Sequence, residues 1–229
     1  TLTFELTLST YLNLDYRDTI LHIVPMYHVH SWGMPYIATL LGLKQVFPGA
    51  FDVNIFFNLV QKEHVTYTCM VPTILHMILT YSNLEKYKPY LKGVKVLVGG
   101  GPLPRSLCEH GRRWGMEVFA GYGLSETCPV LTMAHLRTYM ENWPLEKKID
   151  KWVKTGLPIP LTELQIVDDE GRNVARDNTQ IGEITARAPW LTKRYYKDSE
   201  RTEALWRGNW LHTNDLAVID EEGFVKIVD

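Results

Sequence analysis

The chain has 229 residues, 45% of them hydrophobic and 22% charged, a composition typical of globular proteins. Its formal net charge of −2 gives no electrostatic reason to expect a nucleic acid partner, and no apolar run approaches the roughly 20 residues of a membrane-spanning helix. Three widely spaced cysteines, and an N-terminus without a signal-peptide pattern, favour a reduced, cytoplasmic protein.

Strands and helices alternate in the first half of the chain. Apolar, β-branched and aromatic runs predict strands over residues 20–24, 44–47, 65–70, 94–98 and 116–120. Asp52 can cap a helix that runs to about Lys62, Pro72 fits the start of a second helix, and a third is expected over residues 104–114. These repeated units predict an α/β fold with a helix-covered, mainly parallel sheet. Residues 1–14 fit a strand and a helix equally well.

The second half has a different pattern. Residues 142–153 are polar and charged, which indicates a surface helix or a lid. We expect strands over residues 162–167, 181–188, 216–220 and 224–228, tight turns at 169–171 and 221–223, and a short helix over 198–207. This pattern predicts a smaller, antiparallel β-rich subdomain, and we place the division between residues 1–140 and 141–229.

The segment Gly121–Thr127 is the most informative one. It follows an expected strand and combines two glycines, a tyrosine, a serine and a glutamate. Glycine lets the backbone approach a ligand closely, and a flat ring can stack on a base. A hydroxyl can donate to phosphate, and a carboxylate is a hard ligand for Mg²⁺. The segment alone also fits a strand-to-loop corner with a capping serine, so other segments must support a nucleotide site.

Four further segments support it: Pro25–Gly33, Gly99–Leu103, Lys154–Pro158 and Trp210–Asp215. In order and spacing, the five segments resemble the adenylate-forming enzymes, which include acyl-CoA synthetases, firefly luciferase and peptide-synthetase adenylation domains. Within this group the chain looks most like a medium- or long-chain fatty acyl-CoA synthetase, and the resemblance covers essentially all of it. The implied cofactors are ATP and Mg²⁺, with coenzyme A as co-substrate. In the implied reaction a fatty acid carboxylate attacks the α-phosphate, pyrophosphate leaves, and the coenzyme A thiol then displaces AMP.

The resemblance assigns the nucleotide-binding residues. Tyr122 matches the ring that packs on adenine, and Asp215 matches the carboxylate that accepts from the ribose hydroxyls. Asn214 stands where the family usually has Gly, and because Asn tolerates positive φ we expect the turn to be kept. The remaining nucleotide-side residues are Gly99, Gly100, Gly101, Pro102, Gly121, Gly123 and Ser125. Without the resemblance, Tyr122 fits a core aromatic residue and Asp215 a turn residue.

The resemblance also assigns catalytic and acyl-side residues. Ser125 matches a hydroxyl that contacts phosphate, Glu126 the Mg²⁺-binding carboxylate, and His28 a histidine beside the substrate carboxylate and α-phosphate. Trp32 matches an aromatic gate to a fatty-acid tunnel, although it also fits a core position. The acyl side further includes Gly99, Gly123 and Gly156.

Two residue pairs near these segments receive no further chemical role, and two questions about partners are left open. His28 and His30 have strand-type spacing that could suggest a metal, but we find no third ligand. Tyr195 and Tyr196 are expected to pack the second sheet, without a chemical role. Peripheral membrane contact and a homodimer are left open.

Two features that the resemblance implies are not in the sequence: a Gly-rich loop ending in Pro-Lys-Gly, and a small C-terminal domain with a catalytic Lys. We therefore expect the chain to be an internal part of a longer enzyme and inactive by itself, with that loop before Thr1 and an Arg just after Asp229. Two alternatives stay open. One is another adenylate-forming enzyme, such as an aryl-CoA ligase or a carrier-protein adenylation domain, and the other is a non-catalytic nucleotide- or acyl-binding module.

Overall fold

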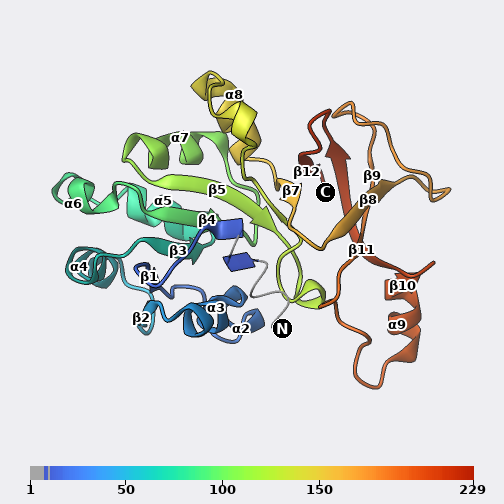
Figure 1. The fold of residues 1–229 in the computed structure, drawn as a ribbon, viewed down its shortest axis with the longest axis horizontal. Coiled ribbons are helices and arrows are strands. Elements are labelled where there is room, and N and C mark those ends of the chain that lie inside the picture. The colour runs from blue at the N-terminus through green and yellow to red at the C-terminus, as the bar shows by residue number, and fades with distance from the viewer. Residues whose placement is uncertain (1–7, 10) are drawn as a thin grey trace.

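A computed structural model describes residues 8, 9 and 11–229, apart from the side chain of His30. Within these residues two β-sheets lie next to each other, one flanked by helices and one curled and antiparallel (Figure 1). This is the expected α/β class with an additional β-rich part. The ambiguous segment 1–14 falls largely outside the described residues.

The first sheet is mainly parallel. Its strand order is β2-β1-β3-β4-β5-β6-β7, and the strands are β1 (Thr19–Leu21), β2 (Lys44–Val46), β3 (Tyr67–Met70), β4 (Lys95–Val98), β5 (Glu117–Tyr122), β6 (Thr132–Met133) and β7 (Leu157–Pro158). The pairs from β2 to β5 are parallel, whereas β6 and β7 add antiparallel pairs at one edge. Doubly wound sheets of this kind bind ligands beyond the carboxyl ends of their strands.

The helices around this sheet are α3 (Met34–Leu41), α4 (Val53–Glu63), α5 (Pro72–Leu79), α6 (Leu84–Leu91), α7 (Arg105–Arg113) and α8 (Leu145–Trp152). Helix α4 begins as expected, because the Asp52 carboxylate accepts from the backbone N–H groups of Asn54 and Ile55 at 2.8 and 2.9 Å. It buries Phe56 and Phe57 in the core. Pro72 begins α5, also as expected. Helix α6 was not predicted from the sequence.

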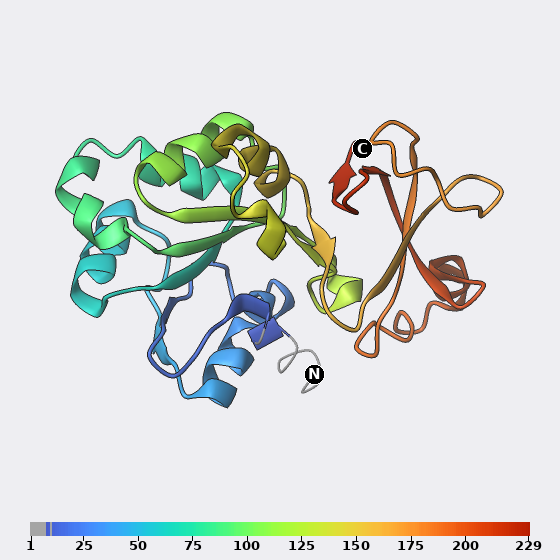
Figure 2. The same cartoon turned by 45° about the horizontal axis from the view of Figure 1, so that its top comes forward.

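The second sheet is antiparallel and follows the order β10-β11-β9-β8, with β12 paired to β11. Its strands are β8 (Glu163–Val167), β9 (Gly182–Arg187), β10 (Trp206–Arg207), β11 (Trp210–Ile219) and β12 (Val225–Ile227), and helix α9 (Ser199–Leu205) precedes β10. Figure 2 shows this sheet beside the larger α/β part, with the short 3₁₀ helix η1 (Ser125–Thr127) between them.

Two sequence expectations need correction. We predicted a strand over 116–120 followed by a turn, but β5 continues through Gly121 and Tyr122. We predicted that a strand begins after Asp215, but Asp215 lies inside the long strand β11. Both strands therefore carry functional candidates within them. The expected division near residue 140 stays a prediction, although α8 contacts α7 and β7 pairs with β6 on the side of the first sheet.

Candidate nucleotide and acyl site

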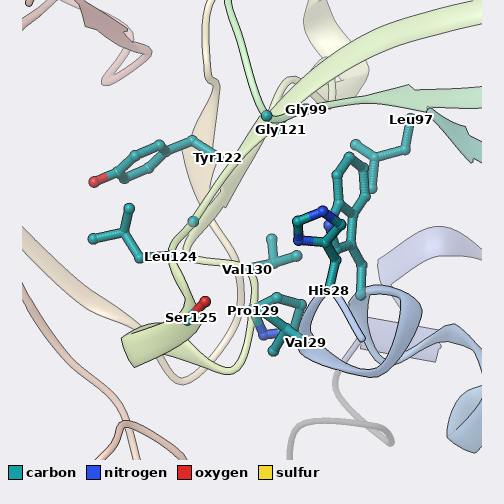
Figure 3. Close-up of a pocket in the computed structure, with 13 residues that line it drawn as sticks. His28, Val29, Leu97, Gly99, Gly121, Tyr122, Leu124, Ser125, Pro129 and Val130 are labelled. Carbon is teal, nitrogen blue, oxygen red and sulfur yellow. The ribbon is translucent and has the colours of Figure 1, made fainter. Parts of the chain in front are cut away.

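A cavity lies beyond the carboxyl ends of β1, β4 and β5 (Figure 3). The segment after β1 contributes His28 and Trp32, the loop after β4 contributes Gly99 and Gly100, and β5 with its following turn contributes residues 121–125. Three of the five segments singled out in the sequence therefore meet at one end of the parallel sheet. This is the place where such sheets bind ligands.

The cavity is small, and apolar surface only slightly exceeds polar surface in its wall. Its volume is about 150 Å³, below the roughly 300–1,000 Å³ of most ligand pockets. Leu97, Pro129 and Val130 form part of its wall, and none of the described residues that line it is Asp, Glu, Lys or Arg. A lining of this kind suits an uncharged, apolar group.

Trp32 explains why the cavity is narrow. A Cβ atom added at Gly99 would lie 3.1 Å from the Trp32 ring, so the indole sits directly against the backbone of this glycine. Gly100 has a φ of 71°, which favours glycine at that position. The glycines of this loop therefore make room for a protein side chain, and a ligand chain that enters beside Gly99 must displace the Trp32 ring.

The segment that carries His28 and Trp32 is strained. In the helical turn α2 (Val29–Trp32) the φ values of Val29, Ser31 and Trp32 are 40°, 54° and 56°. Left-handed backbone costs roughly 1–2 kcal/mol per non-glycine residue, and a β-branched residue such as Val29 is a pronounced outlier. The buried Ser31 hydroxyl donates to the Val24 carbonyl at 2.9 Å and anchors this turn. Strain of this kind often occurs at ligand-binding segments.

Among the described side chains, His28 belongs to no group of metal ligands. His28 is exposed and lies in a turn, and α2 follows it, so the strand-type spacing of His28 and His30 does not correspond to a strand. No group of three or more His, Cys, Asp or Glu side chains among the described residues could hold a metal ion. Figure 3 shows the His28 and Tyr122 rings on opposite sides of β5.

Tyr122 and Asp215 meet across the two sheets. Although they are 93 positions apart, the Tyr122 hydroxyl donates a hydrogen bond to Asp215 Oδ2. Burial is the largest cause that raises the pKa of Tyr122, and the hydrogen bond to Asp215 adds to it. The phenol is therefore protonated at neutral pH. The Glu126 charge makes a smaller contribution that also raises this pKa, so the Glu126 carboxylate lies near enough to the phenol to act on it electrostatically.

A bulge in β11 presents Asp215. The register of β11 against β9 shifts between His212 and Leu216, and Asn214 has a φ of 62°. Asn214 thus adopts the positive φ that was expected of it, but within a bulge of β11 and not in a turn. The Asn214 N–H donates to Glu183 Oε1 at 3.0 Å, and the Thr213 hydroxyl donates to the Ile184 carbonyl at 2.9 Å. The bulge is thus held by two contacts to β9.

Glu183 is a residue that sequence reasoning missed. Besides the Asn214 amide, its carboxylate contacts His212 Nδ1 at 2.7 Å and the Arg207 guanidinium at 3.2 Å. The only sequence signal is a charged residue that alternates with apolar ones in an expected strand, and the strand register is needed to bring it to the bulge.

Glu126 is held from the second half of the chain. The Tyr195 hydroxyl donates to Glu126 Oε1 at 2.7 Å, and the Thr192 N–H donates to the Glu126 carbonyl at 2.9 Å. The hydrogen bond from the Tyr195 hydroxyl to Glu126 is the largest cause that raises the pKa of Tyr195. The expectation that the tyrosine pair packs the second sheet is wrong for Tyr196, which is 86% exposed.

The η1 turn fits a magnesium–nucleotide complex by its donor chemistry. Mg²⁺ commonly takes one or two carboxylates, several waters and substrate phosphate oxygens, without a cage made by the protein alone. Glu126 supplies a carboxylate, and the exposed Ser125 supplies a hydroxyl on the same turn. One carboxylate with a neighbouring hydroxyl matches that pattern.

Besides Glu126 and Asp215, three more candidate residues do not line the cavity. Gly101 and Pro102 are exposed and do not line it. Gly156 pairs with Val225 of β12, and a Cβ atom on it would come within 2.0 Å of the Met133 backbone. The structure thus gives Gly156 a packing role between β6 and β12. The proposed contacts of these residues with a ligand stay predictions.

Comparison with known proteins gives a consistent result. Residues 1–196 match the AMP-binding enzyme family. The long-chain-fatty-acid–CoA ligase of Thermus thermophilus is 42% identical over 219 residues, which is 94% of this chain and 40% of that protein. The chain therefore spans about two fifths of the length of this curated relative.

Solved structures show the same fold. The N-terminal domain of FACL13 from Mycobacterium tuberculosis has a TM-score of 0.85 at 24% identity, over 98% of this chain and 53% of that one. O-succinylbenzoate Coenzyme A Synthetase from Bacillus subtilis, in complex with ATP and magnesium ion, has a TM-score of 0.83 at 26% identity, over 99% of this chain and 44% of that one. No helix among the described residues has the length and apolar character to span a membrane.

Proposed function

This chain belongs to the AMP-binding enzyme family, and we propose that the protein carrying it activates a fatty acid with Mg·ATP and then forms the coenzyme A thioester. The similarity to a long-chain-fatty-acid–CoA ligase supports this proposal, and so does the apolar cavity. One observation carries it. Tyr122 and Asp215, which lie 93 positions apart, are hydrogen bonded, and Glu126 lies close to them.

The chemistry explains why these residue types are needed. A carboxylate is a poor electrophile because its leaving group would be oxide. In the proposed first step a carboxylate oxygen of the fatty acid bonds to the α-phosphorus, and the bond to the α–β bridging oxygen breaks with release of pyrophosphate. In the second step the coenzyme A sulfur bonds to the acyl carbon, AMP departs with the electron pair, and the thiol proton is lost.

The chain's own residues would bind and orient the reactants. Tyr122 presents a flat ring for adenine, and Asp215 presents a carboxylate that can accept from two ribose hydroxyls. Glu126 and Ser125 would hold the magnesium–phosphate group. When bound, the magnesium ion supplies neutralisation of phosphate charge. Fixing both anions in one place converts a bimolecular encounter into a positioned reaction.

The cavity wall supports an apolar acid as substrate. Leu97, Val130 and the Trp32 ring offer no charged partner, so a hydrocarbon tail is better matched than an amino acid side chain with a charge. An aryl acid is the second candidate, because the similar O-succinylbenzoate Coenzyme A Synthetase is named for such a substrate.

Acid-dependent exchange of pyrophosphate into ATP tests the proposal in the natural protein that carries this sequence. Octanoate and palmitate should support exchange, whereas benzoate and free amino acids should not. Exchange with benzoate alone would select the aryl-acid function. Glu126→Gln should lose most of the exchange while AMP binding is retained, whereas a non-catalytic binding module would show no exchange in either form.

We further propose that residues 1–229 alone do not adenylate, and rapid pyrophosphate release from them with ATP, Mg²⁺ and fatty acid would contradict this. A cytoplasmic location also stays a proposal. The three cysteines support it, because Cys69, Cys108 and Cys128 are all free thiols.

A further inference from the structure

Glu126 is held by a segment to which sequence analysis assigned no chemical role. The Tyr195 hydroxyl reaches across 69 positions to donate to Glu126 Oε1 at 2.7 Å. Thr192, three residues earlier, donates its N–H to the Glu126 carbonyl at 2.9 Å. Both the backbone and the side chain of Glu126 are therefore fixed from the same loop between β9 and α9.

Tyr195 is itself held in place. Its N–H donates to Thr202 Oγ1 at 3.0 Å, and the Thr202 hydroxyl donates to the Asp198 carbonyl at 2.6 Å. The Arg201 guanidinium lies 4.9 Å from the centre of the Tyr195 ring. Asp198 also caps α9, because its carboxylate accepts from the Arg201 N–H at 3.0 Å. The Tyr195 backbone and ring are thus held in place by residues at the start of α9.

The neighbouring Tyr196 differs in every one of these respects. It is 86% exposed, and Lys197 Nζ lies 5.3 Å from the centre of its ring. Two tyrosines that follow each other in the sequence therefore provide a functional candidate and a matched control.

When one oxygen of a carboxylate is held by a hydrogen bond, the other oxygen points in a fixed direction. Glu126 Oε2 makes no hydrogen bond to any described residue, while Oε1 accepts from Tyr195. Groups that hydrogen bond to a metal-binding side chain orient it, and their loss typically costs 10- to 100-fold in metal affinity. A free glutamate side chain would also lose rotational entropy on binding, and a pre-oriented one has already lost it.

We propose that Tyr195 is a positioning residue, which holds the Glu126 carboxylate so that Oε2 is presented to the magnesium ion of the bound nucleotide. The inference rests on the proposed function, because it needs a magnesium–nucleotide complex at η1. It adds that the loop between β9 and α9 determines the affinity for the metal ion, while Tyr122 and Asp215 determine the affinity for the nucleoside.

The test measures metal binding without turnover. Mn²⁺ replaces Mg²⁺, the α,β-methylene analogue of ATP replaces ATP, and no acid is added. The dissociation constant of Mn²⁺ is then followed by electron paramagnetic resonance in the natural protein. Tyr195→Phe should raise this constant about 10-fold, and Tyr196→Phe should leave it unchanged. The metal-free affinity for the analogue should be the same in all three proteins.

A second pair of variants tests whether Tyr195 acts through Glu126. Glu126→Gln keeps an oxygen acceptor for the phenol, so the fold of the loop is retained. In this background the additional Tyr195→Phe change should alter Mn²⁺ affinity less than twofold. A further 10-fold loss there, or equal losses in Tyr195→Phe and Tyr196→Phe, would overturn the inference. Wild-type protein that binds no analogue would overturn the proposed function as well, which separates the two failures.

Discussion

The two sheets present functional side chains in different ways. In the first sheet, close contact between backbone segments fixes the turn after β5: a Cβ atom at Gly123 would lie 1.7 Å from the Pro129 carbonyl oxygen. In the second sheet, hydrogen bonds between side chains and backbone fix the bulge that carries Asp215, and the Glu183 carboxylate accepts from the Asn214 N–H. A site assembled from both regions therefore depends on steric fit on one side and on polar contacts on the other.

The cores of the two regions are only partly separate. A large apolar cluster extends through the first sheet and its helices and also takes in Ala186, Leu205 and Leu211 of the second region. A smaller, separate cluster within the second sheet consists of Ile166, Val174, Ile184, Ala217 and Val225. The second region adds a buried ionic group, in which Lys151 and Lys154 contact the Asp220 carboxylate at 2.5 and 2.6 Å. Because Lys151 belongs to α8, this group also ties the second sheet to the helical part.

The largest effect is expected for a methyl group added at Gly123. Gly123→Ala places Cβ inside the contact distance of the Pro129 backbone carbonyl, which cannot move without shifting the surrounding backbone. We expect a loss of about 3 kcal/mol or more in the free energy of unfolding, measured by urea titration. The matched change in the second sheet, Gly171→Ala, meets no atom within 4 Å and has only an unfavourable φ of 76°. It should cost about 1 kcal/mol.

Equal losses for Gly123→Ala and Gly171→Ala would show that backbone contact does not distinguish the two regions. A folded Gly123→Ala protein with wild-type stability would show that the turn after β5 relaxes, and the comparison would then have to be abandoned for this site.

The next largest effect concerns the second sheet, where polar contacts hold the bulge. Glu183→Ala removes the acceptor of the Asn214 N–H and of His212 and Arg207, which should cost about 1–3 kcal/mol of stability. The bulge would lose its hold on Asp215, so ATP affinity should fall more than affinity for 2′-deoxy-ATP. Calorimetric titration of both nucleotides measures this difference.

Glu163→Ala is the matched control for Glu183→Ala. Glu163 lies on β8, its side chain is 70% exposed, and its carboxylate is 3.9 Å from Arg187. An exposed ion pair of this kind contributes about 0–1 kcal/mol. If both variants lost the same affinity for both nucleotides, Glu183 would have no specific effect on ribose recognition.

The dependence of stability on pH should also separate the two regions. Burial is the main cause that lowers the pKa of His22 and His135 in the first region, and the Lys95 charge adds to it at His135. Each folded histidine stays neutral at a pH where the unfolded one, with a pKa near 6.5, binds a proton. The unfolded state therefore gains protons as pH falls below about 6.5, and the stability contributed by the neutral histidines is lost as pH falls toward their folded pKa values.

Asp220 in the second region responds only at lower pH. Burial alone would raise its pKa, but hydrogen bonds from Lys151 and Lys154 outweigh this, and the net pKa is lowered. Its contribution is present above the unfolded pKa, near 3.9, and is lost as pH falls through the folded value. His135→Phe should therefore reduce the fall in melting temperature between pH 7.5 and 5. Asp220→Asn should lower the melting temperature throughout that range without changing the slope.

Sequence reasoning succeeded where local signals determine local structure. The Asp52 cap, the start of α5 at Pro72 and the left-handed backbone conformation of Asn214 are each set by the conformational preference or hydrogen bonding of one residue and its neighbours. The alternation of strands and helices determined the parallel sheet for the same reason. These features need no knowledge of distant residues.

The contacts that complete the site could not be predicted, because they join residues that are between 24 and 93 positions apart. Tyr195 was assigned to packing, since nothing near it in the sequence indicates a carboxylate partner. Glycine patterns were also ambiguous: Gly123 and Gly156 are explained by contact with protein backbone, where the sequence had suggested space for a ligand. Only the packed structure separates these two reasons for a glycine.

The smallest expected effect concerns two residues other than glycine whose backbone is in the left-handed conformation. Val29 in the first region and Asn214 in the second have φ values of 40° and 62°. Left-handed backbone costs roughly 1–2 kcal/mol for an ordinary residue, but Asn is one of the few that adopt it routinely. Glycine removes this strain, and it costs roughly 0.5–1 kcal/mol in backbone entropy. Val29→Gly should therefore stabilise the protein by about 1 kcal/mol, and Asn214→Gly should be close to neutral.

Val29→Gly, which should stabilise the protein more than Asn214→Gly, should be the variant that disturbs fatty acid binding. Val29 lies in the turn that holds Trp32 against Gly99, and relaxation of this turn should let the indole move. The affinity for fatty acid, measured by tryptophan fluorescence, should then differ from wild type in Val29→Gly, although the protein is more stable. Asn214→Gly should leave fatty acid binding unchanged. If Val29→Gly gained no stability, the strain in α2 would be balanced by contacts of the valine side chain, and the turn would be held by packing in the same way as the turn at Gly123.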